Sequence, residues 1–260
     1  MIARFFSKAS AFFVPSLRRA QFWKVLGPGI LFASTAIGVS HLVQSTRAGA
    51  WVGWGLAWAV IAANVAKYPF FEFGSRFANA TGTHLIAGYR SLGKWAAWGY
   101  LILTVLTSFF VLGAIGIVTA SFLDHLLGAS SWTGGNATPN VAIGMFGFSV
   151  VLLAWGKFSV LDGLIKVIAG VLVVSTVVAF AWAWVHTPLS AVPAMPAGFN
   201  PWNGAGLAFL IALMGWMPTA VDLSTWNSMW TIERIRQTGF HPTLEATLRE
   251  FRLGYLISAI

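Results

Sequence analysis

The chain has 260 residues, of which 57% are hydrophobic and only 9% are charged, and its mean hydropathy is +0.75. Charged groups are too few to cover a soluble globular protein of this length, so we expect most of the surface to face lipid. The net charge of +9 comes from basic residues spread between hydrophobic runs, which argues against a nucleic-acid partner, and the absence of cysteine excludes disulfides and thiol chemistry.

The first segment, residues 1–24, is basic and amphipathic. It lacks the uninterrupted apolar stretch and the small-residue cleavage site that a secretory signal peptide carries. We therefore expect residues 1–24 to form a cytoplasmic amphipathic N-terminus.

Hydrophobic runs that are long enough to cross a bilayer recur along the rest of the chain. A helix needs about 20 mostly apolar residues to cross roughly 30 Å of hydrocarbon. Six runs reach this length, and a seventh begins near Phe251 and is cut off at Ile260. The six predicted spans are approximately 26–47, 51–75, 96–125, 139–156, 159–185 and 204–230.

The fourth and fifth spans have an alternative interpretation as one long helix. A helix over 139–185 would extend about 70 Å, more than twice the thickness of the hydrocarbon layer. The sequence therefore favours a hairpin with Lys157 and Asp162 at its tip.

The basic residues predict the orientation of the spans. Lys and Arg precede the first span, lie between the second and third, flank the fourth-to-fifth connection, and follow the sixth. The connections after the third and fifth spans carry none, and the first-to-second turn has only Arg47. Because basic loops stay in the cytoplasm, we expect an integral protein of the bacterial inner membrane with a cytoplasmic N-terminus.

Two of the predicted spans are interrupted by residues that weaken a membrane helix. The first has Gly38, Ser40 and His41 near its midpoint, and the sixth has Pro218 and Asp222. Freed carbonyls at membrane depth are tolerated only where they face protein or a polar cavity. One kink is often structural, but two such breaks at corresponding positions of a repeat indicate a transporter's substrate site. The offset of five spans predicts one repeat followed by an inverted second repeat.

These segments resemble the Nramp family of divalent metal-ion transporters. The stretch GPGILFASTAIGVSH is similar to the family's first span, FGSRFANATGTHL to its second-span exit, and MGWMPTAVDLST to its sixth-span motif through Met217 and Pro218. The resemblance implies an all-α integral membrane protein with the LeuT-type inverted-repeat fold. Residues 25–186 would form the first repeat, and residues 203–260 would form the start of the second.

The resemblance also implies where a metal ion would bind. In the family, an Asp and an Asn of the first break and a Met of the sixth span coordinate the ion together with backbone carbonyls. Carried onto this sequence, the Met is retained as Met217, the Asn position falls on His41 and the Asp position falls on Gly38. The candidate metal-binding residues are Met217, His41, Gly38, Thr35, Met214 and Asp222.

The ligand types favour a transition metal, although the usual anionic ligand is missing. Thioether and imidazole suit late first-row divalent ions, whereas carbonyls and hydroxyls suit harder cations. For Met217 the alternative is ordinary packing, and for His41 it is a hydrogen bond to a carbonyl. Asp222 would supply the missing charge only if the break turns it toward Met217, because five residues correspond to about 140° around a regular helix.

Two charged groups of the second span have structural interpretations. Lys67 is the candidate counter-ion of Asp222, and such a pair would remove Asp222 from the metal site. Glu72 and Arg76 stand four residues apart in the favourable order for a helical ion pair.

The function implied by the resemblance is secondary transport of a divalent metal cation by alternating access. The metal is the cargo, no cofactor is expected, and no motif indicates an enzyme. Proton coupling is not expected, because the third span, TSFFVLGAIGIVTASF, carries no carboxylate. The alternatives are the same fold carrying Mg²⁺ or a small organic solute, or a membrane sensor or scaffold that does not transport. The sequence predicts no oligomeric state.

Overall fold

A computed structural model describes residues 24–38, 40–155, 158–186, 188, 194–196 and 198–259. Every regular element in these ranges is helical, so the expectation of an all-α protein is confirmed. The predicted amphipathic N-terminus before Lys24 lies outside the described residues, as do Lys157 and the side chain of Asp162.

In chain order, the helices are α3 (Pro28–Ala36), the π-helix η1 (Ser40–Ser45), α4 (Thr46–Val52), the 3-10 helix η2 (Gly53–Leu56), α5 (Ala57–Thr81), α6 (Leu85–Leu92), α7 (Lys94–Leu127), α8 (Ala129–Thr133), α9 (Thr138–Trp155), α10 (Phe158–His186), α11 (Gly204–Trp216), α12 (Leu223–Thr238) and α13 (Leu244–Ala259).

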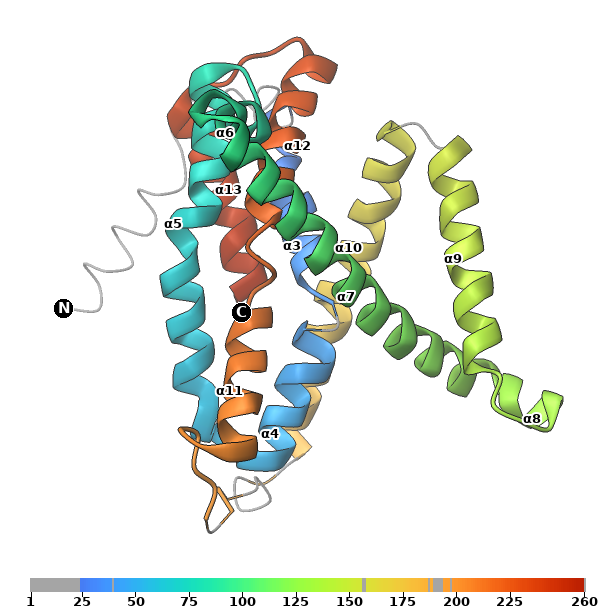
Figure 1. The fold of residues 1–260 in the computed structure, drawn as a ribbon. Helices are drawn as coiled ribbons and strands as arrows, with labels where there is room; N and C mark the ends of the chain where they lie inside the picture. The colour runs from blue at the N-terminus through green and yellow to red at the C-terminus, as the bar shows by residue number, and fades with distance from the viewer. Residues whose placement is uncertain are drawn as a thin grey trace.

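A packed bundle holds the helices at the two ends of the sequence together (Figure 1). Helix α5 packs against α11, α12 and α13, and α3 packs against α12 and α13. Near α3, the ring of Phe32 lies 5.0 Å from that of Phe71 and 5.6 Å from that of Phe251, between ring centroids. A second apolar cluster joins α4, η2, α5 and α11 around Val52 and Leu213.

Helices α7 and α9 pack against each other and extend away from this bundle in Figure 1. Only Gly116, Ala120 and Asp124 of α7 are buried, and no residue of α9 is. Large apolar side chains are exposed instead, including Phe109 at 77%. An apolar surface of this extent is unfavourable in water and suits a lipid environment.

In the described residues, three helical stretches are long and apolar enough to cross a membrane. They are His41–Thr81, Lys94–Leu127 and Thr138–Trp155, and two shorter apolar helices cover Gly170–His186 and Gly204–Trp216. The expectation of long apolar helices that could cross a membrane is therefore confirmed by length and composition.

The third, fourth and fifth predicted spans match α7, α9 and α10, whose ends lie within two residues of the predicted ones. Helix α9 ends at Trp155 and α10 begins at Phe158, and the two helices run in opposite directions in Figure 1. The single long helix over 139–185 is thus wrong.

Three predicted boundaries need correction. The chain reverses at η2 and not at residues 48–50, because Gly53, with φ 55°, adopts a conformation that disfavours other residues. Helix α12 continues to Thr238, eight residues beyond the predicted end of the sixth span. Helix α13 begins at Leu244, before the apolar run near Phe251, with Glu245 in its first turn.

The N-terminus of α3 is fixed by a carboxylate of α13. The Gly27 and Gly29 amides donate to Glu250 Oε1 at 2.9 and 2.8 Å, and the Gly29 amide is also 2.9 Å from Oε2. Pro28 has no N–H, so the carboxylate satisfies both amide donors at this end. The two helices can approach this closely because Gly254 of α13 lies against the Gly29 backbone.

We predict that Gly254→Leu destabilises the bundle by about 1–3 kcal/mol, the usual cost of overpacking a tight contact. A Cβ at position 254 would collide with the Gly29 backbone, whereas one at Gly144 on α9 would have no neighbour within 4 Å. The measurement is the thermal unfolding midpoint of detergent-solubilised protein, with Gly144→Leu as the matched control. Equal midpoints for the two variants would contradict the close α3–α13 contact.

Candidate functional site

Both predicted breaks are present, and they lie together. Helix α3 ends at Ala36 before η1 begins at Ser40, and α11 ends at Trp216 before α12 begins at Leu223. Helix α11 packs on η1 and α12 packs on α3, so both breaks lie near the middle of the bundle in Figure 1. The expectation of two discontinuous helices is confirmed.

The side chain of Lys67 reaches the second break from α5. Its Nζ donates to the carbonyl oxygens of Met214 at 2.8 Å, Gly215 at 2.6 Å and Thr219 at 3.3 Å. Carbonyls in the last turn of a helix have no N–H partner within that helix, so Lys67 satisfies groups that the break leaves free. Because an ammonium has three N–H donors, these carbonyls use all of them.

Asp222 lies at the other side of the same break, immediately before the first residue of α12. A carboxylate is favourable there because the helix dipole is positive at the N-terminus. The expected Lys67–Asp222 ion pair is wrong: Lys67 binds the three carbonyls instead. The Lys67 ammonium is therefore bound at the C-terminal end of α11, and the acidic residue Asp222 lies at the N-terminal end of α12.

The two methionines of the predicted site lie on the packed side of α11. Met217 is 1% exposed and belongs to the apolar cluster formed by α4, η2, α5 and α11. Met214 is partly buried against the same cluster, and it contributes its carbonyl oxygen to Lys67. In this conformation the Met217 thioether packs in an apolar cluster. Packing is the alternative to metal binding that the sequence left open for Met217.

The His41 imidazole is held by two other elements. Its Nε2 lies 2.7 Å from the Ser258 carbonyl oxygen on α13, and the ring also interacts with the Ala36 backbone. A carbonyl only accepts, so Nε2 carries the hydrogen in the Ser258 contact. A metal-ligand role for His41 requires that the ring give up one of these contacts.

Gly38 and Thr35 supply oxygen atoms to the first break. The Gly38 carbonyl accepts from the His41 and Leu42 amides at 3.1 and 2.9 Å. The Thr35 hydroxyl donates to the Leu31 carbonyl at 2.9 Å and to the Phe32 carbonyl at 3.0 Å, within its own helix. The Thr35 hydroxyl oxygen keeps its lone pairs for a cation, whereas the Gly38 carbonyl oxygen already accepts two hydrogen bonds, and neither oxygen carries a charge.

Neither Gly38 nor Gly215 is required by close packing at its break. A Cβ added at Gly38 or at Gly215 would meet no atom within 4 Å. A small cavity lies at the N-terminus of α3, where Glu250, Arg234 and Thr231 line it. That cavity is part of the contact between α3, α12 and α13 and is separate from the breaks.

Within the described part of the chain, no group of three or more His, Cys, Asp or Glu side chains is placed to hold a metal ion. A cation at the breaks would therefore depend on backbone carbonyls, with Met217, His41 and Asp222 as the predicted side chains of suitable chemistry. Such an oxygen-rich set suits harder cations, and the thioether and imidazole extend it to transition metals.

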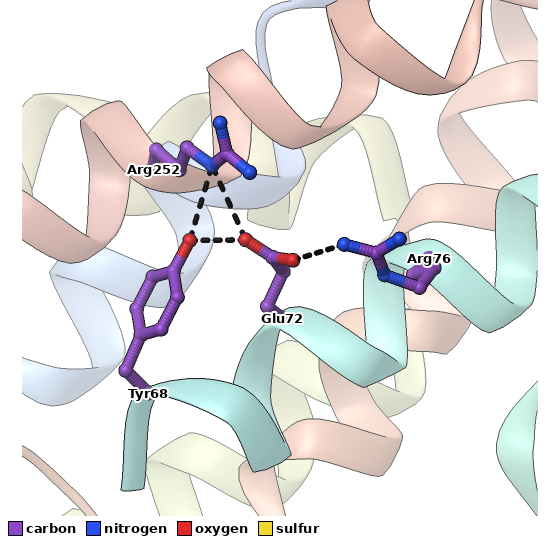
Figure 2. A network of polar contacts seen from close by, with 4 residues as sticks. All are labelled: Tyr68, Glu72, Arg76 and Arg252. Atoms are coloured by element: carbon purple, nitrogen blue, oxygen red, sulfur yellow. Dashed lines mark hydrogen bonds and ion pairs between the residues drawn. The ribbon is translucent and has the colours of Figure 1, made fainter. Parts of the chain in front are cut away.

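A network of polar contacts links α5 to α13 one helical turn beyond Lys67 (Figure 2). Arg252 Nε donates to the Tyr68 hydroxyl at 3.0 Å and to Glu72 Oε2 at 3.2 Å. Tyr68 and Arg76 also donate to the Glu72 carboxylate. The predicted Glu72–Arg76 pair is confirmed, and Arg252 adds a link from α5 to α13 across a long sequence separation.

Sequence reasoning missed the carbonyl partners of Lys67 and the Tyr68 and Arg252 partners of Glu72. A backbone carbonyl partner cannot be recognised from the sequence, because every residue has one. A lysine inside an apolar helix nevertheless indicates that a hydrogen-bond acceptor lies near it. A helix broken by proline supplies such acceptors. The contact of Lys67 with the break could therefore have been predicted from Lys67 and Pro218 considered together.

The comparisons with known proteins support relatedness but assign no function. The chain is 38% identical over 236 residues to the uncharacterized protein PM0681 of Pasteurella multocida (strain Pm70). The match covers 90% of this chain and 53% of the relative, so the chain spans about half the length of that protein. No family model matches the chain. No solved structure matches it either.

We predict that Glu72→Gln destabilises the protein by about 1–3 kcal/mol, because it leaves two arginines and a tyrosine without their carboxylate. The matched control is Glu245→Gln, which removes another pair of the same spacing with Arg249. The Glu245 side chain is 71% exposed and that of Glu72 only 10%, so the control is expected to change stability by less than about 0.5 kcal/mol.

The measurement is chemical unfolding of both variants in the same detergent. An equal loss of stability in both would show that the link to Arg252 contributes nothing beyond a surface ion pair.

Proposed function

We propose that this protein is a secondary transporter, related to the Nramp family and of the LeuT-type fold, that moves a divalent metal cation by alternating access. In this mechanism, one group of helices rocks against the other around a site at the two breaks. The observation that carries the proposal is the pair of adjacent helix breaks, one of which gathers carbonyl oxygens around a positive charge.

The arrangement of apolar surface supports a transporter embedded in lipid. Helices α7 and α9 expose apolar side chains almost throughout, while the polar contacts gather in the bundle of α3, α5, α11, α12 and α13. Polar and charged residues inside a membrane protein are costly and usually mark a substrate pathway. Lys67, Asp222 and His41 all lie within this bundle, next to the breaks.

The chemistry at the α11–α12 break supports a cation as cargo. The C-terminal end of a helix carries a partial negative charge, and unwound carbonyls near such an end coordinate cations in broken-helix transporters. Met217 and His41 add the softer ligands that favour Mn²⁺ or Fe²⁺ over Mg²⁺ if they turn toward the ion. Asp222 is the nearby source of the negative charge that a divalent ion requires.

A small organic anion is the less supported cargo. Lys67 would be the natural partner of a substrate carboxylate, but all three of its N–H donors are directed at carbonyls. Proton coupling is not part of the proposal: α7 has no carboxylate between Thr107 and Phe122, and Asp124 near its end accepts hydrogen bonds from Ser130 and Thr138.

We predict that Mn²⁺ enters proteoliposomes that contain the protein expressed from its complete reading frame, at an initial rate well above that of empty vesicles. Asp222→Ala and His41→Ala are expected to lower that rate about tenfold, as loss of a metal-site side chain generally does. The measurement is the signal of a metal-sensitive dye trapped inside the vesicles, with Mn²⁺, Fe²⁺ and Mg²⁺ tested in parallel.

His125→Ala is the matched control, because His125 is an exposed histidine on α7. Entry of Mg²⁺ alone would replace the transition-metal cargo with a hard cation. If none of the three ions enters, the proposal of metal transport is wrong.

A further inference from the structure

We propose that Lys67 is a tethered cation that occupies the carbonyl site of the α11–α12 break, and that the cargo cation binds there only after the Lys67 ammonium has left. This inference rests on the proposed function for the identity of the cargo. Its structural basis is the set of contacts that Lys67 makes.

The geometry around Lys67 Nζ is that of a small cation site. Three carbonyl oxygens lie between 2.6 and 3.3 Å from the nitrogen, and they come from Met214, Gly215 and Thr219 on both sides of the helix end. The Leu213 carbonyl, by contrast, accepts the Met217 amide at 3.1 Å and so completes the helix. The ammonium therefore binds carbonyl oxygens that are not used by backbone N–H donors.

No described carboxylate forms an ion pair with Lys67. The ion pairs of the neighbouring network join Glu72 to Arg76 and to Arg252. Asp222, the acidic residue of the break, lies at the N-terminus of α12, where the helix dipole already favours its charge. The positive charge of Lys67 is thus balanced by carbonyl dipoles alone, as the charge of a bound cation would be.

Two cations cannot share these oxygens. Their repulsion at hydrogen-bonding distance is strong in a low-dielectric interior, and the carbonyls are too few to complete two coordination shells. Cargo binding and the Lys67 contact therefore exclude each other. Displacement of Lys67 would also release a side chain of α5 that bonds to the α11 break, which couples binding to movement of α5 against α11.

The competing interpretation is a structural cap, in which Lys67 only satisfies the last carbonyls of α11. The two interpretations predict opposite effects on cation binding. Removing a cap lowers stability and leaves cation affinity unchanged or weaker. Removing a tethered cation frees the site and tightens binding.

The test is equilibrium binding of Mn²⁺ to the purified protein from the complete reading frame, comparing wild type with Lys67→Met and with the exposed-lysine control Lys94→Met. We expect Lys67→Met to bind Mn²⁺ at least about tenfold more tightly than wild type, and Lys94→Met to bind like wild type. Unchanged or weaker binding by a folded Lys67→Met variant, or no binding by any of the proteins, overturns the proposal.

A second measurement uses wild-type protein and so does not depend on the variant folding. Mass spectrometry follows labelling of the Lys67 amine by an amine-reactive reagent, with and without saturating Mn²⁺. Labelling of Lys67 is expected to rise several-fold when Mn²⁺ displaces it, while labelling of Lys94 stays constant. Unchanged labelling of Lys67 with Mn²⁺ bound overturns the proposal.

The outcomes separate this inference from the proposed function. If Mn²⁺ enters proteoliposomes but neither binding nor labelling responds at Lys67, the tethered-cation proposal fails and transport stands. If Lys67→Met gains Mn²⁺ binding but no ion enters vesicles, the cation site stands and the transport proposal fails.

Discussion

The contact between the Lys67 ammonium and the end of α11 is the interaction on which the centre of this structure depends. A helix that stops inside an apolar bundle leaves carbonyls that neither lipid nor apolar side chains can satisfy. Lys67 satisfies the Met214, Gly215 and Thr219 carbonyls from the neighbouring helix. The break at Pro218 is therefore stable in a place where an unpartnered break would be costly, and α5 is positioned against α11.

Other polar contacts in the bundle also join helices that are far apart in the sequence. Glu250 of α13 binds the amides at the start of α3, and Arg252 of α13 binds Tyr68 and Glu72 of α5. Helix α13, late in the chain, thus fixes two helices from its beginning. Because Glu250 and Arg252 are only two residues apart, both links lie at the same level of α13.

The sequence predicted the parts of the fold that depend on local composition. Uninterrupted apolar runs located α7, α9 and α10 to within two residues, and Gly38 and Pro218 located the breaks, because each follows from backbone chemistry. The ends of α12 and α13 were missed, since polar residues such as Glu245 extend these helices past the apolar runs. The partners of Lys67 and the Arg252 partner of Glu72 are distant in sequence, and carbonyl acceptors are the same in every residue, so only the structure places them.

The measurement that tests the account most directly is the anomalous diffraction signal of Mn²⁺ in crystals of the protein from its complete reading frame. The account predicts one strong peak at the α11–α12 break, within coordination distance of the Met214 and Thr219 carbonyl oxygens, with Lys67 Nζ moved away from them. A peak elsewhere, or Lys67 still bound to its three carbonyls in crystals saturated with Mn²⁺, would contradict it.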